Sequence, residues 1–414
     1  MINILTYDQI DQQQWQELVQ SSPVATWFQT PEAYRFYQSV GGMQAFAYGV
    51  VEVECKVESV KCKDLENSAA ENPASSLIAS SPHRLASDSD HASTPYTLHP
   101  TPALKGVIVG YITRERNALK QFFTRRAIIY GGPLLAEDIS ETALAELLNA
   151  VSQFKVEGLK FKGTASRLIA SSPHRLASDS DHASTPYTLR PTPIYIETRN
   201  FHDYSRWKAV FEANGFKYQS HLNFHVNTTS ADLAQSNIGK HRWKYIRLSM
   251  RDGAKIVENP TLEQVQAFYT ILQDLYRTKV KTPLWSWEFF EQLYRVEHAK
   301  YILVELDGQI VGGTACVCLP GKAIYEWYAC GLDNCRDDIR PLSIAIWGEM
   351  LYAAENGYPL FDFMGAGKPD EPYGVRDFKA EFGGELVEHG RFLSVRKPLL
   401  YKIGTLGVKW LKRK

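Results

Sequence analysis

The order of predicted helices and strands occurs twice along this chain of 414 residues. In the second half, two predicted helices are followed by three strands, at 301–306, 309–319 and 322–332. Asp307-Gly308 is a strong hairpin signal between the first two strands. A helix over 341–356 then precedes a short apolar strand that begins at Leu360. The sequence therefore predicts an α/β (α+β type) fold of two halves, with mixed, mostly antiparallel sheets flanked by helices.

The first half has the same order but is interrupted by a repeat. Its strands are expected at 2–7, 43–57, 104–114, 127–135, 194–197 and 218–226, and its helices at 12–20, 31–39, 141–154 and 204–214. The 22 letters of Leu77–Leu98 occur again, unchanged, at Leu168–Leu189. Their Ser, Pro, Asp and His content cannot bury a core. We therefore expect disordered inserts at about 72–102 and 164–193.

Composition limits the classes of function. Lys+Arg and Asp+Glu both number 46, so any site for a polyanion must be a local patch. The six cysteines form no CxxC pair, so we expect reduced thiols and no metal. The start of the chain lacks a leader pattern, and no apolar run is long enough to span a membrane. These features favour a cytoplasmic globular protein.

The stretch 358–392 has the pattern of an active-site edge. Its apolar strand stops at Gly365-Ala366-Gly367, and a polar loop leads to a short amphipathic turn with Phe378 and Lys379. A closing strand is predicted over 385–395. The alternative is an ordinary surface loop with a solvated lysine.

Four segments together resemble a known family: YEWYACG from Tyr325, CRDDIRPLS from Cys335, FDFMG from Phe361 and YGVRDFKAEFGG from Tyr373. They are similar to the second half of the FemABX aminoacyltransferases, closely over about 240–414 and more loosely before it. The resemblance implies two tandem GNAT-like acyltransferase domains. It also implies transfer of an amino acid from aminoacyl-tRNA to an amine of a peptidoglycan precursor's stem peptide, without a cofactor. The implied domains are 1–239 and 240–395, followed by a basic tail at 396–414.

Phe378 and Lys379 match the family's Phe-Lys pair, which lies at the channel joining the two substrates. Acyl transfer from an ester to an amine is downhill, so the enzyme must mainly align the partners and stabilise an oxyanion. Lys379 could supply that charge or contact the ribose and phosphate of a tRNA, and Phe378 could exclude water or be a core residue. Asp362 and Asp377 are candidates for the base, although Asp362 could equally be a strand-end residue bonded to backbone amides.

Four residues are expected to bind the precursor: Tyr328, Arg277, Arg340 and Arg376. Tyr328 matches a family tyrosine that lines the precursor site. Arg277 lies near the family's precursor-binding arginine, with Lys279 and Lys281 as competing alignments. The other two arginines could pair with phosphates or carboxylates, although Arg340 could instead bridge the neighbouring acidic residues.

Two basic segments are candidates for contact with larger partners. Lys240, Lys244, Arg247 and Arg251 fall on one face of a predicted helix over 239–251, the best patch for tRNA. The alternative is a solvated helix face. The tail at 397–414 is basic and amphipathic, which suits peripheral contact with an anionic membrane surface. It could equally be a helix that packs back on the first half.

Two other functions stay open. The first is an acyl-CoA-dependent GNAT N-acyltransferase, whose pyrophosphate site needs a glycine-rich loop before a helix. The segment 335–343 has no glycine, and Gly131-Gly132 is the only comparable run in the first half. The second is a catalytically inactive protein that binds muropeptides.

Overall fold

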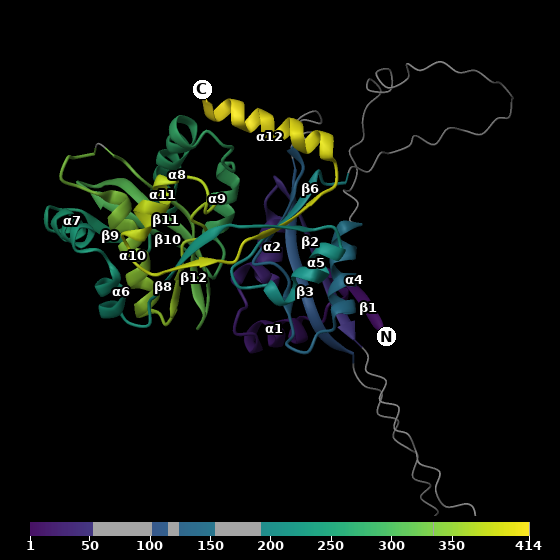
Figure 1. Cartoon of the computed structure of the whole chain (residues 1–414). Helices are drawn as coiled ribbons and strands as arrows, with labels where there is room; N and C mark the ends of the chain where they lie inside the picture. Colours follow the sequence, from purple (N-terminus) through teal and green to yellow (C-terminus); the bar gives the residue numbers. More distant parts are fainter. Residues whose placement is uncertain (53–101, 115–123, 154–191, 334, 414) are drawn as a thin grey trace, which may run out of the picture.

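The computed structural model describes residues 1–52, 102–114, 124–153, 192–333 and 335–413 (Figure 1). The two predicted inserts lie outside the described residues except at their last positions. The two halves lie side by side, each built on one sheet, and the last helix extends across one end of both (Figure 1).

The first sheet has the strand order β1-β2-β3-β4-β6-β15-β7, with β5 paired to β3. Its strands are β1 (Ile2–Thr6), β2 (Met43–Glu52), β3 (Ala103–Thr113), β4 (Ala127–Tyr130), β5 (Leu134–Leu135), β6 (Tyr195–Arg199), β7 (Lys217–Gln219) and β15 (Arg391–Val395). The helices of this half are α1 (Gln12–Ser21), α2 (Pro31–Ser39), α4 (Glu141–Ser152) and α5 (Lys208–Ala213).

The second sheet has the order β14-β8-β13-β12-β11-β10-β9. Its strands are β8 (Leu222–Asn227), β9 (Lys255–Val257), β10 (Ala299–Leu306), β11 (Gln309–Leu319), β12 (Ala323–Gly331), β13 (Leu360–Asp362) and β14 (Glu385–Glu388). The helices are α6 (Ala231–Asn237), α7 (Lys240–Arg251), α8 (Leu262–Leu275), α9 (Trp287–Tyr294), α10 (Pro341–Glu355), α11 (Gly374–Ala380) and α12 (Pro398–Arg413).

Each sheet contains a parallel strand pair joined by a crossover helix. In the first sheet β4 runs parallel to β6, and α4 connects them. In the second sheet β12 runs parallel to β13, and α10 connects them. Parallel neighbours need such a crossover, whereas the other pairs are antiparallel. The two halves therefore share one architecture, as the repeated element order predicts.

The two halves exchange strands, which the sequence did not reveal. β15, from the end of the chain, lies between β6 and β7 of the first sheet. Conversely, β8, from the first part of the chain, lies between β13 and β14 of the second sheet. The predicted domain boundary at 239/240 remains a proposal, and hydrogen-bonded strands cross it in both directions.

The exchange corrects two predicted strands. The run predicted over 218–226 is divided into β7 and β8 at Ser220-His221, and the run over 385–395 into β14 and β15 at His389-Gly390. Gly390 has a φ of 64°, and a Cβ there would lie 2.3 Å from the Tyr218 ring. Only glycine is free of strain in such a place. The chain therefore bends from one sheet into the other at these two breaks.

A third predicted strand, over 127–135, is also divided. Gly131 and Gly132 both have positive φ, of 78° and 72°, and separate β4 from β5. The carbonyl oxygens of both glycines accept hydrogen bonds from Gln29 Nε2, at 3.1 and 3.0 Å. This run is buried between its neighbours.

One apolar cluster extends through both halves. Phe28 and Phe36 of the first half pack against Trp327 and Phe289 of the second, with ring centroids 5.1 and 5.2 Å apart. Lys322 Nζ also donates to the carbonyl oxygens of Val19 and Gln20 (3.0 and 3.1 Å), at the end of α1. The halves are thus joined by a shared core as well as by the exchanged strands. Among the described residues, no helix has the length and apolarity to cross a membrane.

If β15 is an integral part of the first half, then Phe392→Ala should destabilise the protein strongly. Phe392 is 1% exposed and stacks on Phe211 with ring centroids 4.0 Å apart. Loss of such a side chain should lower the free energy of unfolding by about 3–5 kcal/mol in urea denaturation. Leu399→Ala, on an exposed position of α12, is the control and should change it by less than about 0.5 kcal/mol. Equal effects would refute the integration of β15 into this core.

Candidate active site

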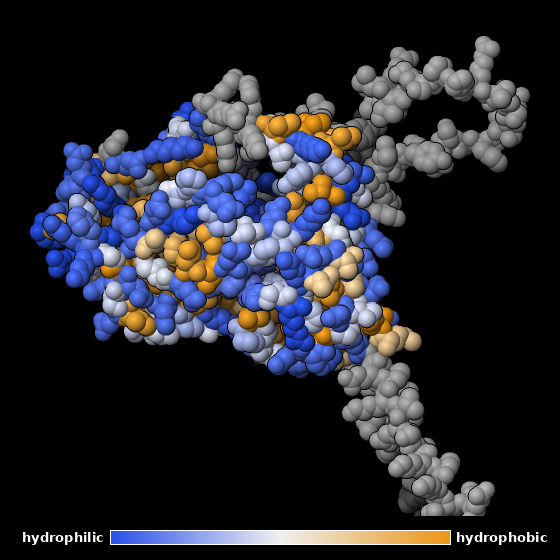
Figure 2. Space-filling view, viewed as in Figure 1, coloured by the Kyte–Doolittle hydropathy of each residue, from blue (hydrophilic) through white to orange (hydrophobic). Residues whose placement is uncertain are grey.

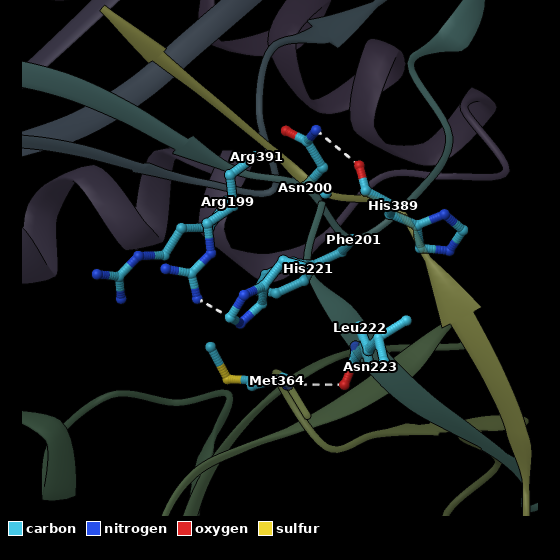
Figure 3. A pocket seen from close by; sticks show the side chains of 11 residues that line it. Arg199, Asn200, Phe201, His221, Leu222, Asn223, Met364, His389 and Arg391 are labelled. Atoms are coloured by element: carbon cyan, nitrogen blue, oxygen red, sulfur yellow. Dashed lines mark hydrogen bonds between the residues drawn. The ribbon is translucent and has the colours of Figure 1, made fainter. Parts of the chain in front are cut away.

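A pocket lies where the two strand breaks meet the ends of β6 and β13 (Figure 3). It contains about 270 Å³ of empty space, its open mouth included. The lining residues come from four segments of the chain: Arg199, Asn200, Phe201, His221, Leu222, Asn223, Met364, Gly365, His389, Gly390 and Arg391. Because His221, His389 and Gly390 belong to the breaks themselves, the pocket is a direct consequence of the strand exchange.

One wall of the pocket is the loop that follows β13. Met364 has a φ of 55°, a left-handed conformation that is strained for a residue with a side chain. Its N–H donates to Asp362 Oδ1 at 2.6 Å, and the next N–H, of Gly365, donates to Asn223 Oδ1 at 2.7 Å. The end of the apolar strand that the sequence predicts before Gly365 is therefore a turn held by side-chain hydrogen bonds, and this turn shapes the pocket.

Lys379 is hydrogen-bonded to the backbone of this loop. Its Nζ donates to the carbonyl oxygens of Phe363 (2.6 Å) and Gly365 (3.0 Å) and lies 3.5 Å from Glu326 Oε1. The parallel ladder of β12 and β13 ends at Tyr325, so Lys379 lies where these strands diverge. Its side chain is only 12% exposed. The alternative of a solvated surface lysine is therefore wrong, while a catalytic role for Lys379 stays a prediction.

Glu326, beside Lys379, is a candidate base that sequence reasoning missed. Burial raises the pKa of Glu326 to about 7, against the opposing effect of the Lys379 ammonium. Glu349 on α10 is also fully buried, and burial together with the charge of Glu326 raises its pKa. A carboxyl group with a pKa near neutrality suits general base catalysis. A glutamate within the otherwise apolar run IYEWYAC was the available signal.

Asp362 has the contacts of a positioning residue. Its Oδ1 accepts from Asn223 Nδ2 (2.7 Å) and from the N–H of Met364, and its Oδ2 lies 3.0 Å from His225 Nε2. Burial would lower the pKa of His225, but the Asp362 carboxylate raises it overall. Both carboxylate oxygens are thus engaged within the protein. This geometry does not favour Asp362 as the base and agrees better with the strand-end alternative.

Two arginines and one glutamate form a charged cluster beside the pocket. Arg391 Nη1 donates to Glu197 Oε1 at 2.7 Å, and Arg391 Nη2 lies 2.8 Å from His221 Nε2. Arg199 Nη1 donates to the Tyr130 hydroxyl at 2.7 Å. Burial would raise the pKa of Glu197, but the two guanidinium groups lower it to about 2. Burial and Arg391 lower the pKa of His221 to about 3, so this imidazole is neutral at physiological pH.

Only a weak signal for this cluster is present in the sequence. Glu197 and Arg199 are two residues apart on β6, so they share a face of a strand that is otherwise mostly apolar. Arg391 and His221 are far away in the chain, and only the strand exchange brings them to β6.

Phe378 connects α11 to the basic helix α7. Its ring lies 5.3 Å from the ring of Phe382, and the guanidinium of Arg242 lies 4.6 Å above it. Arg242 also forms an ion pair of 2.9 Å with Glu381. Phe378 is partly buried, so the structure is compatible with both predicted roles, as a shield against water and as a packing residue.

The four residues predicted to bind the precursor differ in how their side chains are engaged. Arg376 and Arg340 bond to backbone carbonyls: Arg376 Nε to Ala366 (2.8 Å), and Arg340 Nη1 to Asp337 (2.6 Å) and Ile339. Tyr328 packs against Phe290, with ring centroids 5.1 Å apart.

Arg277 differs from these three because it is 74% exposed, in a π-helical turn over Tyr276–Val280. Such turns are frequent at functional sites. Arg277 therefore remains the residue of this set that is most available to a ligand.

The predicted basic helix is confirmed as α7, and Lys240, Lys244, Arg247 and Arg251 are all exposed on it. Ile246 is buried on the opposite face. Arg251 forms an ion pair with Asp252 at 2.8 Å, which reduces the local excess of positive charge. The arrangement fits a solvated face as well as a face for a polyanion.

The segments that could hold the pyrophosphate of CoA are poorly suited to it. The carbonyls of Gly131 and Gly132 are bonded to Gln29, and a strand, β5, rather than a helix follows them. At the start of α10, the Arg340 side chain is directed to the carbonyls of its own loop. The Gly131 N–H already donates to the carbonyl oxygen of Arg199 (2.8 Å), and the Arg340 N–H donates to Ser249 Oγ (3.1 Å). Pro341 has no N–H, so neither segment resembles a glycine-rich phosphate loop.

One group of side chains has the composition of a metal site. Ligand atoms of Glu32, Glu297 and His298 lie within 4.8 Å of one another. Glu32 Oε2, however, accepts from Trp27 Nε1 at 2.7 Å and lies 3.0 Å from His298 Nδ1. These contacts join the two halves of the protein and explain the grouping without an ion.

Comparison with known proteins gives a family match over the second half. Residues 240–379 match the family model described as "Acetyltransferase (GNAT) domain". No curated protein matches the chain. Among solved structures, a crystal structure of FemX has a TM-score of 0.58 and 13% identity, and the match covers 97% of this chain and 99% of that one.

Two further solved structures are more distant. L-PGS from Bacillus licheniformis has a TM-score of 0.43 and 13% identity, with 75% of this chain and 87% of that chain covered. A tandem GNAT protein from the clavulanic acid biosynthesis pathway has a TM-score of 0.45 and 8% identity, covering 95% and 98%.

These findings confirm the expected fold and the class of enzyme. The family match makes residues 240–379 an acyltransferase domain of the GNAT type. The likeness to FemX extends over nearly the whole chain and shows that both halves together have the fold of FemX. The resemblance to the FemABX proteins is thus confirmed for the fold.

The pKa of Glu326 leads to a prediction on stability. Its value rises from 4.5 to about 7 in the folded protein. Between these pH values the folded protein retains a proton that the unfolded chain has released, so stability should fall as pH rises through this window. The expected loss is about 3 kcal/mol. Glu326→Gln cannot ionise, and urea denaturation from pH 4.5 to 8 should show a correspondingly flatter profile.

The control is Glu355→Gln, an exposed position on the same helix as Glu349. It should retain the wild-type dependence on pH. A Glu326→Gln profile parallel to that of the wild type would show that Glu326 ionises normally in the folded protein.

Proposed function

We propose that this protein transfers an amino acid from aminoacyl-tRNA to an amine of a peptidoglycan precursor's stem peptide. The observation that supports this most is the fold of FemX over 97% of the chain, with the Phe378-Lys379 pair at the divergence of β12 and β13. The GNAT-type match of the second half supports acyl transfer as the reaction.

The reaction requires little from the protein beyond alignment and electrostatics. The amine of the acceptor attacks the ester carbonyl, the ester C–O bond breaks, and the ribose hydroxyl leaves with a proton. Lys379 is a buried cation whose present acceptors are two neutral carbonyl oxygens, so its charge could act on a developing oxyanion nearby. Glu326, 3.5 Å from Lys379, could accept the proton that the amine loses.

The donor and acceptor would use different parts of the second half. The exposed face of α7 could contact the tRNA backbone, since Lys240, Lys244 and Arg247 all point to solvent. Arg242 connects α7 to α11 and hence to Phe378 and Lys379. Arg277 and Tyr328 are the proposed contacts of the precursor.

The two alternatives receive less support. An acyl-CoA donor would need a glycine-rich phosphate loop before a helix, but the segment before α10 has no glycine and the Gly131-Gly132 run is followed by β5. An inactive muropeptide-binding protein would have no use for a carboxyl group of raised pKa beside a buried lysine.

The proposal predicts that the purified protein adds an aminoacyl mass to a precursor muropeptide when charged tRNA is supplied. Lys379→Met, which retains the side-chain volume, should lower kcat/KM by about 100-fold because it removes the cation nearest the reacting carbonyl. Lys255→Met, at an exposed position of β9, is the control and should retain full activity. Mass spectrometry of the muropeptide is the measurement.

Transfer from acetyl-CoA, with none from charged tRNA, would contradict the proposed donor. Full activity of Lys379→Met would instead remove Lys379 from the mechanism and leave the donor unaffected.

We also propose that α12 rests on an anionic membrane surface. Leu399, Ile403 and Leu406 are spaced four and three residues apart, so they share one face, and they are 78%, 56% and 66% exposed. Figure 2 shows the resulting hydrophobic patch over α12. At the start of the helix, Tyr401 packs on Tyr195 of the first half, with ring centroids 5.4 Å apart.

Replacing Leu399, Ile403 and Leu406 with serine should reduce sedimentation with anionic phospholipid vesicles by about tenfold or more, because the apolar face is lost. Leu386→Ser, an exposed apolar position on β14, is the control. Equal binding of wild type and triple variant would contradict the proposed contact.

A further inference from the structure

The charged cluster beside the pocket contains more positive than negative charge. Arg199 and Arg391 contribute two guanidinium groups, and Glu197 contributes one carboxylate. His221 adds no charge, because its pKa is about 3. Arg126, before β4, is close enough for its charge to oppose that of Arg199. The two arginines share one carboxylate, so the cluster has a net positive charge of at least one.

This excess charge is largely removed from water. The side chains of Arg199 and Arg391 are 26% and 24% exposed, and that of Glu197 is 11% exposed. Arg199 Nε is buried and has no hydrogen-bond partner. A net charge that is buried without a full counter-charge is strongly unfavourable. An anion in the adjacent pocket would relieve that cost.

The donors are arranged for such an anion. Figure 3 shows the guanidinium groups of both arginines on the same side of the pocket, with His221 beside Arg391. Because a guanidinium only donates, His221 Nε2 must accept from Arg391, which leaves the proton on Nδ1 and makes this nitrogen a further donor. A guanidinium pair of this kind suits the planar oxygens of a carboxylate or the oxygens of a phosphate.

We propose that Arg199 and Arg391 form an oxyanion-binding subsite. It binds a carboxylate or phosphate group of a substrate in the pocket at the two strand breaks. The loop held by Lys379 forms the facing wall, since Gly365 lines the pocket and its carbonyl oxygen accepts from Lys379 Nζ. An anion bound here would thus lie beside the proposed reaction centre. The assignment to a substrate rests on the proposed function, whereas the anion site does not.

Two sources of the anion fit this chemistry. One is the free carboxylate at the end of the acceptor's stem peptide, and the other is a phosphate near the end of the donor tRNA. Both would be recognised by the same guanidinium pair, so binding experiments must separate them.

The test is equilibrium binding to the full chain. Inorganic phosphate and acetate probe the anion site itself. A stem peptide with a free terminal carboxylate, compared with its terminal amide, probes the acceptor, and a CCA trinucleotide probes the donor. Arg391→Gln and Arg199→Gln should weaken the binding of phosphate and acetate, and of whichever substrate fragment uses the site, by about tenfold or more. Arg396→Gln, exposed on the same segment, is the control and should leave them unchanged.

Glu197→Gln gives the sharper result, because it removes the carboxylate that competes for both arginines. It should strengthen anion binding several-fold, whereas a purely structural role of the cluster predicts no gain. A preference for the free carboxylate over the amide, lost in Arg391→Gln, assigns the subsite to the acceptor. Binding of the CCA trinucleotide that is lost in Arg391→Gln assigns the subsite to the donor.

The inference is overturned if neither phosphate nor acetate responds to any of these three variants. Such a failure would leave the proposed function intact as long as transfer from charged tRNA is observed. Conversely, anion binding without transfer would overturn the proposed function alone.

Discussion

The exchange of β8 and β15 between the two sheets is the constraint on which the rest of this structure depends. Each of these strands is hydrogen-bonded on both edges within the sheet of the other half. The halves therefore cannot separate without breaking four strand pairings, which is strongly unfavourable for buried backbone groups. The breaks in the exchanged segments, and with them the pocket that they line, are therefore held between the two sheets.

Two charged clusters near this pocket are in different electrostatic states. On one side the Lys379 ammonium faces Glu326, a carboxyl group whose pKa near 7 lets it gain or lose a proton at physiological pH. On the other side Glu197 stays ionised, with a pKa of about 2, between two arginines. The first pair is suited to moving a proton, whereas the second is suited to holding an anion. The proposed transfer between two anionic substrates would use both properties.

Much of the fold could be predicted from the sequence, because the hydrophobic periods and glycine signals are local. The repeated order of elements, the exit of β13 at Gly365 and the position of Lys379 after it all agree with the structure. The strand breaks could not be predicted in this way, because Ser220-His221 carries no strong turn signal. The partner sheet, not the local sequence, decides where each strand ends.

Only part of the candidate site could be predicted from the sequence, because the rest of it is brought together by tertiary contacts. Lys379 and Phe378 lie in one continuous motif, so the resemblance found them. Glu326 is adjacent to Lys379 only through the divergence of β12 and β13, and Arg199 meets Arg391 only through the exchange. Asp362 is close to the motif in sequence, yet its oxygens are engaged by Asn223, His225 and Met364.

The central claim is that substrates bind at the pocket formed by the strand exchange. Amide hydrogen exchange, measured by mass spectrometry with and without precursor muropeptide and charged tRNA, tests it most directly. The account predicts slower exchange on ligand addition in Phe363–Gly367 and in His389–Arg391, the two segments that line the pocket from opposite sides. Protection confined to other segments, with none in these two, would contradict it.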